Sequence, residues 1–307
     1  MKMPRHKTGP PEGATIITKY AQFEELIKSF VKGFITLLTL VGHPGLCKSQ
    51  CVRRAIRNEK CLYVKGRKSP IDLYCDLYAR QDCPVVSDDS GDLLSVQRCL
   101  EYLMILTETD RHKVLPWGTS TKLLKARGVP KQFYTTSTVC IITNRWGTGP
   151  IYDALESRGE FVYFDPDWNE LYKQCGGWFW DQEIFDYVRE RMQNLKQPDA
   201  RLLVKAAARK AAGMKTLPWK KLIDDYQDDK IGMTVRELIA DDSYPNEAAR
   251  EEVFTACTGA DRSTYYRRKK DIARFQPKKL PARIILKRTE RPVEKRPADG
   301  AIDDGAG

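Results

Sequence analysis

The sequence predicts an α/β protein with a parallel sheet, a helical lid and a small all-α C-terminal domain. Short apolar, β-branched runs alternate with helical periodicity up to about residue 175. This alternation is typical of parallel βαβ units with helices on both faces of the sheet. Beyond Trp178 no further buried strand is expected, and helical patterns take over, with breaks at Pro198, Gly213 and Pro218.

The expected elements follow from periodicity and from turn residues. Helical spacing of apolar residues predicts helices over 21–31, 48–59, 71–78 and 93–107. Apolar and β-branched runs predict strands over 35–41, 61–64, 84–87, 138–143 and 161–164. The predicted domains are a flexible N-terminus over 1–20, an α/β core over 21–175, a helical lid over 176–216, a helical module over 217–276 and a disordered, mostly basic tail over 277–307.

Composition and charge narrow the class of protein. No apolar stretch is long enough to span a bilayer, so we expect no membrane association and a cytoplasmic location. Nine cysteines without a C-x-x-C pair and three histidines support neither a zinc knuckle nor a disulfide framework. The formal net charge is +11, and 14 Lys/Arg against three acids lie between Arg262 and Arg296. A basic C-terminal segment on a neutral body indicates a polyanionic partner.

A glycine-containing loop follows the run 35–41 and precedes a helix. Its residues are Gly42, His43, Pro44, Gly45, Leu46, Cys47, Lys48 and Ser49, followed by Gln50. In a phosphate-binding P-loop, glycines turn backbone N–H groups inward, the lysine neutralises β/γ-phosphate charge and the hydroxyl ligates Mg²⁺. Cys47 stands where the second defining glycine is expected, so its Cβ would crowd the loop or force a strained backbone. The loop predicts a P-loop NTPase domain that binds ATP and Mg²⁺.

Two carboxylates follow the run 84–87. Asp88 is expected to hold the Mg²⁺ shell together with Ser49, and Asp89 to orient an attacking water. A solvated turn is the competing interpretation of these two acids. The upstream loop favours the phosphoryl-transfer interpretation.

The order of these motifs resembles that of the AAA+ ATPases over about 21–214. The resemblance implies three further roles. Asn144, at the end of the run 138–143, matches sensor 1, and Arg158 is similar to an arginine finger that completes a neighbouring subunit's site. Arg201 is the candidate for sensor 2 on the lid helix 200–212, with Arg209 as its substitute. Arg145, next to Asn144, would also face a nucleotide. Asp89 replaces the family's more frequent glutamate, so slow hydrolysis is expected.

The C-terminal module resembles a helix-turn-helix. Thr234 with Glu237 forms a capping-box pattern opening one helix, Asn246 caps a second, and Thr258–Ala260 is a tight turn before a basic helix. The residues expected to contact DNA are Arg262, Ser263, Thr264, Tyr265, Tyr266, Arg267, Arg268, Lys269 and Lys270. A basic face that only keeps the tail in solution is the competing interpretation.

These features together predict an ATP-binding AAA+ protein that acts on or with DNA. Transposition helpers and replication-initiation or loader ATPases share this layout, with ATP controlling assembly of a homo-oligomer. Any protein client is left unidentified by the sequence. A hydrolysis-deficient ATP-binding scaffold, and a nucleotide-sensing DNA-binding regulator, remain the alternatives.

Overall fold

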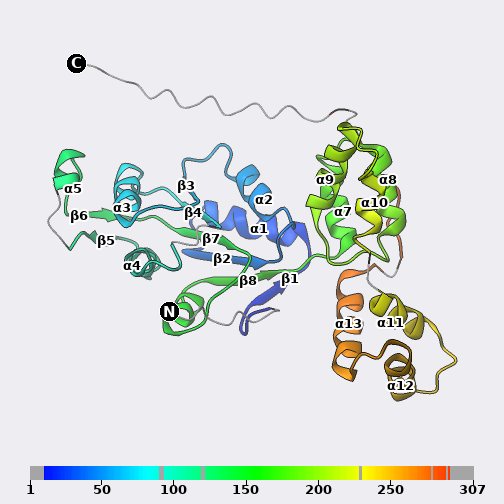
Figure 1. Ribbon diagram of the computed structural model, residues 1–307. Helices are drawn as coiled ribbons and strands as arrows, with labels where there is room; N and C mark the ends of the chain where they lie inside the picture. The colour runs from blue at the N-terminus through cyan, green and yellow to red at the C-terminus, as the bar shows by residue number, and fades with distance from the viewer. Residues whose placement is uncertain are drawn as a thin grey trace. The chain divides into compact units, whose positions relative to one another are not determined.

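The computed structural model describes residues 10–89, 93–118, 122–227, 230–277, 279–287 and 290. The chain divides into two compact units between Pro166 and Asp167. The first holds a parallel sheet and its helices, and the second is helical (Figure 1). The expected α/β core ended at 175, so the observed boundary comes about ten residues earlier than that expectation.

The sheet of the first unit has six strands, and all its neighbouring pairs are parallel. In spatial order the strands are β1 (Thr15–Ile17), β8 (Glu160–Phe164), β2 (Leu37–Gly42), β7 (Val139–Thr143), β4 (Val85–Asp88) and β3 (Leu62–Lys65). The carboxyl ends of β2, β7 and β4 therefore lie side by side at one edge of the sheet. Ligands of open parallel sheets bind at this edge.

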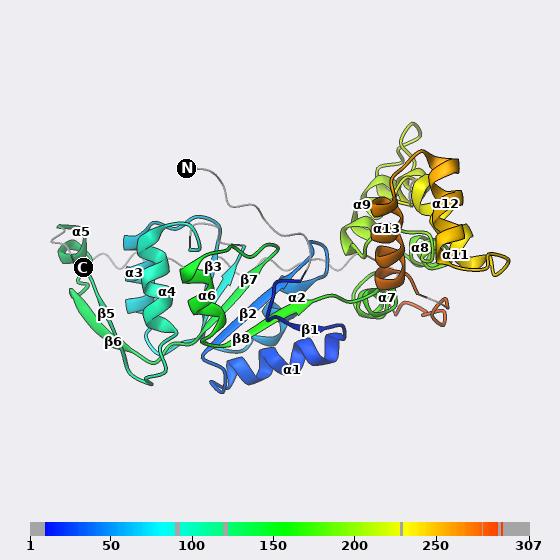
Figure 2. The same cartoon turned by 90° about the horizontal axis from the view of Figure 1, so that it is seen from below.

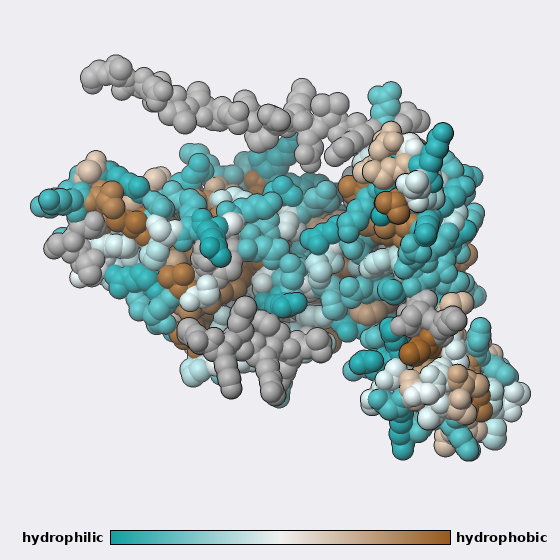
Figure 3. Space-filling model, in the orientation of Figure 1, coloured by the Kyte–Doolittle hydropathy of each residue, from teal (hydrophilic) through white to brown (hydrophobic). Residues whose placement is uncertain are grey.

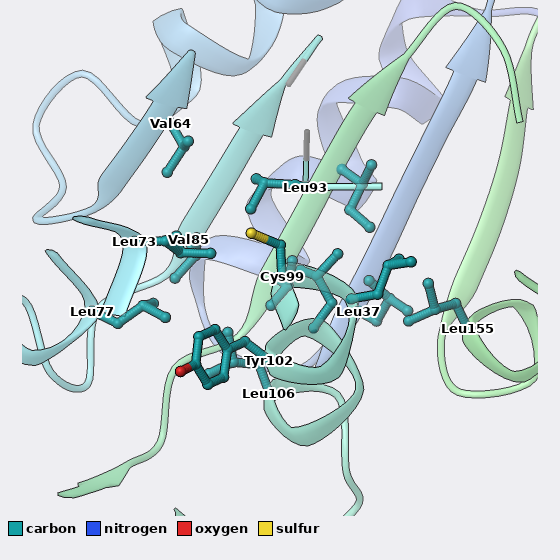
Figure 4. Packing of buried hydrophobic residues seen from close by; sticks show 14 of the residues in the cluster. Leu37, Val64, Leu73, Leu77, Val85, Leu93, Cys99, Tyr102, Leu106 and Leu155 are labelled. Carbon is teal, nitrogen blue, oxygen red and sulfur yellow. The ribbon is translucent and has the colours of Figure 1, made fainter. Parts of the chain in front are cut away.

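Helices cover both faces of the sheet (Figure 2), as the sequence predicted. They are α1 (Tyr20–Val31), α2 (Lys48–Ala55), α3 (Pro70–Ala79), α4 (Gln97–Leu106) and α6 (Pro150–Glu156). Phe23 of α1 packs on Phe164 of β8, with ring centroids 4.5 Å apart. On the other face, residues of α3, α4 and α6 pack against Leu37 and Val85 (Figure 4). The alternation of β8 and β2 side chains between these two layers fixes the register of the sheet.

The N-terminal prediction needs one correction. Thr15–Ile17, placed in a flexible segment by the sequence, form β1 and pair in parallel with Val162–Phe164 of β8. Three residues are too few for the alternation of a strand to be recognised in the sequence. In the structure this β-branched run satisfies the open backbone groups at that edge of the sheet. Residues 1–9 lie outside the described residues.

A hairpin between α4 and β7 was not predicted. It consists of β5 (Lys113–Pro116) and β6 (Gln132–Thr135), which pair antiparallel with each other only, and the short helix α5 (Lys122–Ala126) lies between them. Phe133 packs against Tyr74 and Tyr78 of α3. The hairpin is thus anchored on the helical layer and not on the main sheet.

The second unit begins with four helices: α7 (Trp168–Gly176), α8 (Gln182–Arg191), α9 (Ala200–Ala211) and α10 (Trp219–Asp224). Asp167, Asp181 and Asp199 cap the first three by accepting hydrogen bonds from backbone N–H groups of their first turns. Tyr172 and Phe185 stack with ring centroids 4.0 Å apart. Among the described helices, none is both long enough and apolar enough to span a bilayer.

Three more helices complete the unit: α11 (Lys230–Ala240), α12 (Glu247–Thr258) and α13 (Arg262–Phe275). Asn246 caps α12 as predicted, accepting a hydrogen bond from the Ala249 amide. Thr234 does not open a helix, because α11 starts at Lys230 and places it in the interior. Gly259, with φ of 67°, ends α12 in the left-handed region, and Asp261 caps α13.

The described part of the predicted disordered tail is ordered. Arg283 forms an ion pair with Asp186 of α8, and the Leu286 amide donates to Gln182 Oε1. Arg283 holds the pKa of Asp186 below its usual range. A run of basic residues broken by prolines suggested disorder, but local composition does not reveal an acidic partner more than 90 residues upstream. Residues 278, 288–289 and 291–307 of the predicted tail lie outside the described residues.

Candidate functional site

The glycine loop joins the end of β2 to the start of α2. A Cβ at Gly42 would lie 2.5 Å from the carbonyl oxygen of Phe164, so only glycine fits beside β8. Gly45 has φ of 86°, and Cys47 has φ of 58° and ψ of 17° at the N-cap of α2. The expected backbone strain at Cys47 is confirmed, since a residue with a Cβ occupies the left-handed region there.

Side chains of α1 and β8 contact the loop on its inner side. The buried hydroxyl of Tyr20 donates a 2.9 Å hydrogen bond to the carbonyl of Leu46, whose side chain is itself buried. The ring of His43 meets Tyr163 edge-on at 6.3 Å between centroids. Pro44 and Gln50 are exposed. The loop therefore has a fixed base and an open outer side.

Lys48 lies at the centre of the site, and its side chain is buried. Its Nζ donates to the carbonyls of Gly42 and His43 at 2.7 Å each, and to Asn144 Oδ1 at 3.0 Å. The cation is held by loop carbonyls and by the end of β7. An anion bound in the loop would meet this ammonium group directly.

Asp88 ends β4, next to β7 in the sheet, and is buried. Ser49 Oγ donates to Asp88 Oδ1 at 2.5 Å, and the Tyr63 hydroxyl donates to Asp88 Oδ2 at 2.6 Å. Burial, followed by the hydrogen bond to Asp88, raises the pKa of Tyr63, so the phenol stays a donor at neutral pH. Both carboxylate oxygens of Asp88 are thereby fixed in place.

Tyr63 was missed by the sequence reasoning. It comes from β3, the strand beyond β4, and no local pattern distinguishes it from a tyrosine that only packs in the sheet. Only the strand order could have identified it, since β3 is the neighbour of β4. The donor set Ser49 and Asp88 is all oxygen, which is the ligand type that Mg²⁺ prefers. These two residues fit the predicted magnesium site.

Asp89 and Asn144 meet beside Lys48. Asn144 Nδ2 lies 3.1 Å from each carboxylate oxygen of Asp89, while its Oδ1 accepts from Lys48. Asp89 has φ of 50° and an exposed side chain. The amide of Asn144 thus links the loop lysine to the exposed carboxylate, and the structure brings together the residues predicted from three separate strand ends.

A cleft of about 870 Å³ adjoins the start of the loop. It is lined by Pro11, Glu12, Gly13, Val41, His43, Pro44, Asn144, Arg145, Trp146, Gly147, Thr148, Asp153, Glu156 and Tyr163. The indole N–H of Trp146 donates to Glu156 Oε1 at 2.7 Å, which fixes one wall. Arg145 is exposed, and its guanidinium makes no hydrogen bond or ion pair with another described residue. A cleft of this volume has room for a nucleotide.

Of the two other predicted arginines, Arg158 belongs to the first unit and Arg201 to the second. Arg158 lies two residues before β8, at the amino-terminal edge of the sheet, and donates to the carbonyl of Met104 in α4 at 2.5 Å. Arg201 lies on α9 in the second unit, with an exposed side chain and its amide capped by Asp199. Among the described residues, Arg158 forms no hydrogen bond or ion pair with the loop, and Arg201 belongs to the other unit, so the roles of arginine finger and sensor 2 stay predictions.

The basic helix α13 carries the residues predicted to contact DNA. Tyr265 is a correction, because it is fully buried against Phe254 and donates to Glu247 Oε1 at 2.7 Å. Apolar spacing on α13 explains the burial, since Tyr265 and Ile272 both pack in the core of the module. Tyr265 cannot face a ligand. Its side chain is part of the hydrophobic core of the module.

The cations of α13 divide into two groups. Arg262 pairs with Glu251 at 3.1 Å, and Lys269 pairs with Glu247 at 2.5 Å. Arg267 and Lys270 are exposed, and neither forms an ion pair with a described residue. Ser263 and Thr264 belong to the Asp261 cap, while the Tyr266 hydroxyl donates to Glu251 and Arg268 is half-buried. Arg267 and Lys270 are the cations best placed to meet a polyanion.

Comparison with known proteins identifies no family for this chain. No protein-family model matches the chain, and no curated protein matches it. The chain is similar to the crystal structure of NtrX from Brucella abortus in complex with ATP, at a TM-score of 0.38 and 10% sequence identity. That match covers 87% of this chain and 69% of NtrX. A TM-score this low supports no functional argument. The chain's own strand order and glycine loop define a P-loop-like α/β fold.

Proposed function

We propose that the chain binds ATP with Mg²⁺ at the loop from Gly42 to Ser49. The observation that carries this proposal is the convergence of Lys48, the Ser49–Asp88 pair and the Asn144–Asp89 pair at one sheet edge. The N-terminus of α2 and the loop amides favour an anion there. Lys48 would turn from the loop carbonyls to the β/γ-phosphates, and the adjoining cleft would take the remainder of the nucleotide.

Hydrolysis is the second part of the proposal. Ser49 and Asp88 would hold Mg²⁺, which would neutralise charge on the phosphates. Asp89 would accept the proton of the attacking water, and Asn144 would keep its carboxylate in position. The strained Cys47 and the short side chain of Asp89 favour slow turnover.

Oligomer formation and DNA binding complete the proposal. Arg158, at the edge of the sheet opposite the loop, would reach the nucleotide of a neighbouring copy, and Arg201 would act from the helical unit. Helix α13 would dock on duplex DNA through Arg267 and Lys270. Replacing both with alanine is expected to weaken duplex binding and to lower the salt slope by about two. Arg262→Ala, which removes a cation already paired with Glu251, is the matched control.

A hydrolysis-deficient ATP-binding scaffold is the alternative, favoured by the left-handed backbone at Cys47 and Asp89. Phosphate release with and without duplex DNA, alongside ATP binding, separates the two. If the chain is an ATPase, the wild-type protein releases phosphate, whereas the Asp89→Asn variant releases none and keeps its affinity for ATP. No release by the wild type together with intact ATP binding selects the scaffold.

A further inference from the structure

The hairpin β5–β6 has one buried and one open face. Leu115 and Phe133 point to the helical layer and are buried, whereas Val114 and Tyr134 are directly paired across the strands and are exposed. Tyr134 is 65% exposed, and no described residue accepts or donates a hydrogen bond to its side chain. An aromatic ring this open, on a hairpin that pairs with no other described strand, is not required by the fold.

The charged side chains of the hairpin segment itself are all basic. From Arg111 to Ser137 the sequence contains six Lys/Arg and neither Asp nor Glu. Lys113 is buried and donates to the Ser137 carbonyl, and Arg127 pairs with Asp72. The other four, all exposed, are Arg111, Lys122, Lys125 and Lys131.

Figure 3 shows hydrophilic residues around a small apolar patch at the hairpin end of the first unit. Within the segment from β5 to β6, Val114 and Leu123 are 39% and 51% exposed. A stable protein interface would need a much larger apolar surface, of the order of 800 Å² per partner. A polyanion with flat, accessible rings fits this surface better than a folded protein does.

We propose that the outward face of the β5–β6 hairpin binds single-stranded nucleic acid. A base stacks on Tyr134 beside Val114, and Arg111, Lys125 and Lys131 neutralise the flanking phosphates. Stacking requires an unpaired base, because the faces of bases in a duplex are covered by their neighbours. The hairpin surface therefore binds a different ligand from the one proposed for α13, and this binding does not depend on ATP.

The test uses the full chain carrying Arg267→Ala and Lys270→Ala, so that binding through α13 is weakened. Fluorescence anisotropy with a labelled oligo-dT of about 20 nucleotides, without ATP, measures the affinity. Tyr134→Ala is expected to weaken binding about 5- to 150-fold, the equivalent of one stacked base. Tyr134→Phe keeps the ring and should stay within about twofold. Lys125→Glu with Lys131→Glu should weaken binding and flatten its salt dependence.

Phe34 supplies the matched control, because it is 80% exposed and lies outside the hairpin. Phe34→Ala should leave the affinity unchanged, and the melting temperatures of all variants should agree, since Tyr134 is not buried. Unchanged oligo-dT affinity in Tyr134→Ala would overturn the proposal. Equal losses in Tyr134→Phe and Tyr134→Ala would also overturn it, as would tighter binding of a duplex with the same dependence on Tyr134.

Discussion

Tyr63→Phe removes one hydroxyl and leaves the ring in place. Asp88 is only 2% exposed, so water cannot easily replace the lost 2.6 Å hydrogen bond to Oδ2. Hydrogen bonds to charged groups contribute about 1.5–3 kcal/mol. Because the buried Asp88 Oδ2 would lose its donor, we expect the free energy of unfolding to fall by an amount in that range. A urea titration followed by circular dichroism measures this change.

The same substitution should also affect Mg²⁺, if the proposed function holds. With one oxygen released, the Asp88 carboxylate rotates more freely, and the Mg²⁺ concentration needed for half-maximal ATP binding should rise roughly tenfold. Tyr78→Phe is the matched control, because that tyrosine packs on Phe133 and its hydroxyl has no hydrogen bond to a described residue. If Tyr63→Phe behaved like Tyr78→Phe in both assays, the reasoning about Asp88 would be refuted.

Three further predictions concern the loop, the C-terminal module and the oligomer. Cys47→Gly relieves a left-handed conformation that costs about 1–2 kcal/mol, while the added flexibility of glycine costs about 0.5–1 kcal/mol. The free energy of unfolding should therefore stay level or rise by up to about 1.5 kcal/mol, and a loss above about 1 kcal/mol would contradict the observed backbone. Lys269 and then Tyr265 lower the pKa of Glu247, so its stabilising effect is present above the ordinary value of 4.5 and is lost as pH falls through the lowered pKa. The melting temperature of Glu247→Gln should therefore be lower than that of the wild type at pH 7 and equal to it at pH values well below 4.5. A difference in melting temperature that persists in acid would count against the ion pair. Arg158→Ala and Lys48→Ala proteins should each lack ATPase activity and regain part of it when mixed, and no recovery on mixing would exclude Arg158 as a finger between subunits.

Local sequence pattern was sufficient for five of the six strands of the main sheet and for the loop. The strands β2, β4 and β7 are apolar or β-branched runs, and Lys48, Asp88 and Asn144 lie at or shortly after their ends. These three residues could therefore be assigned to one edge of the sheet from the sequence. Cys47 could be recognised as strained because its position in the loop demands a left-handed backbone. These features depend on residues that are neighbours in the chain.

Features that depend on distant partners could not be predicted. Tyr63 reaches Asp88 only because β3 lies beside β4, and Arg283 is ordered only because Asp186 lies on α8. The hairpin strands have four residues each, which is too short for a period to appear. Tyr265 was assigned to DNA from its basic neighbours, although its spacing to Ile272 matches a buried helical face.

The central claim is that Lys48 makes the loop a site for the phosphates of ATP. Isothermal titration with ATP and Mg²⁺ tests it in the wild type, in Lys48→Ala and in Lys48→Met, which keeps most of the buried side-chain volume. Lys28→Ala, on the exposed side of α1, is the matched control. Loss of a charged contact of about 1.5–3 kcal/mol predicts roughly 10- to 150-fold weaker binding in both Lys48 variants and no change in the control. Affinities within about threefold of wild type in folded Lys48 variants would contradict the assignment of the loop.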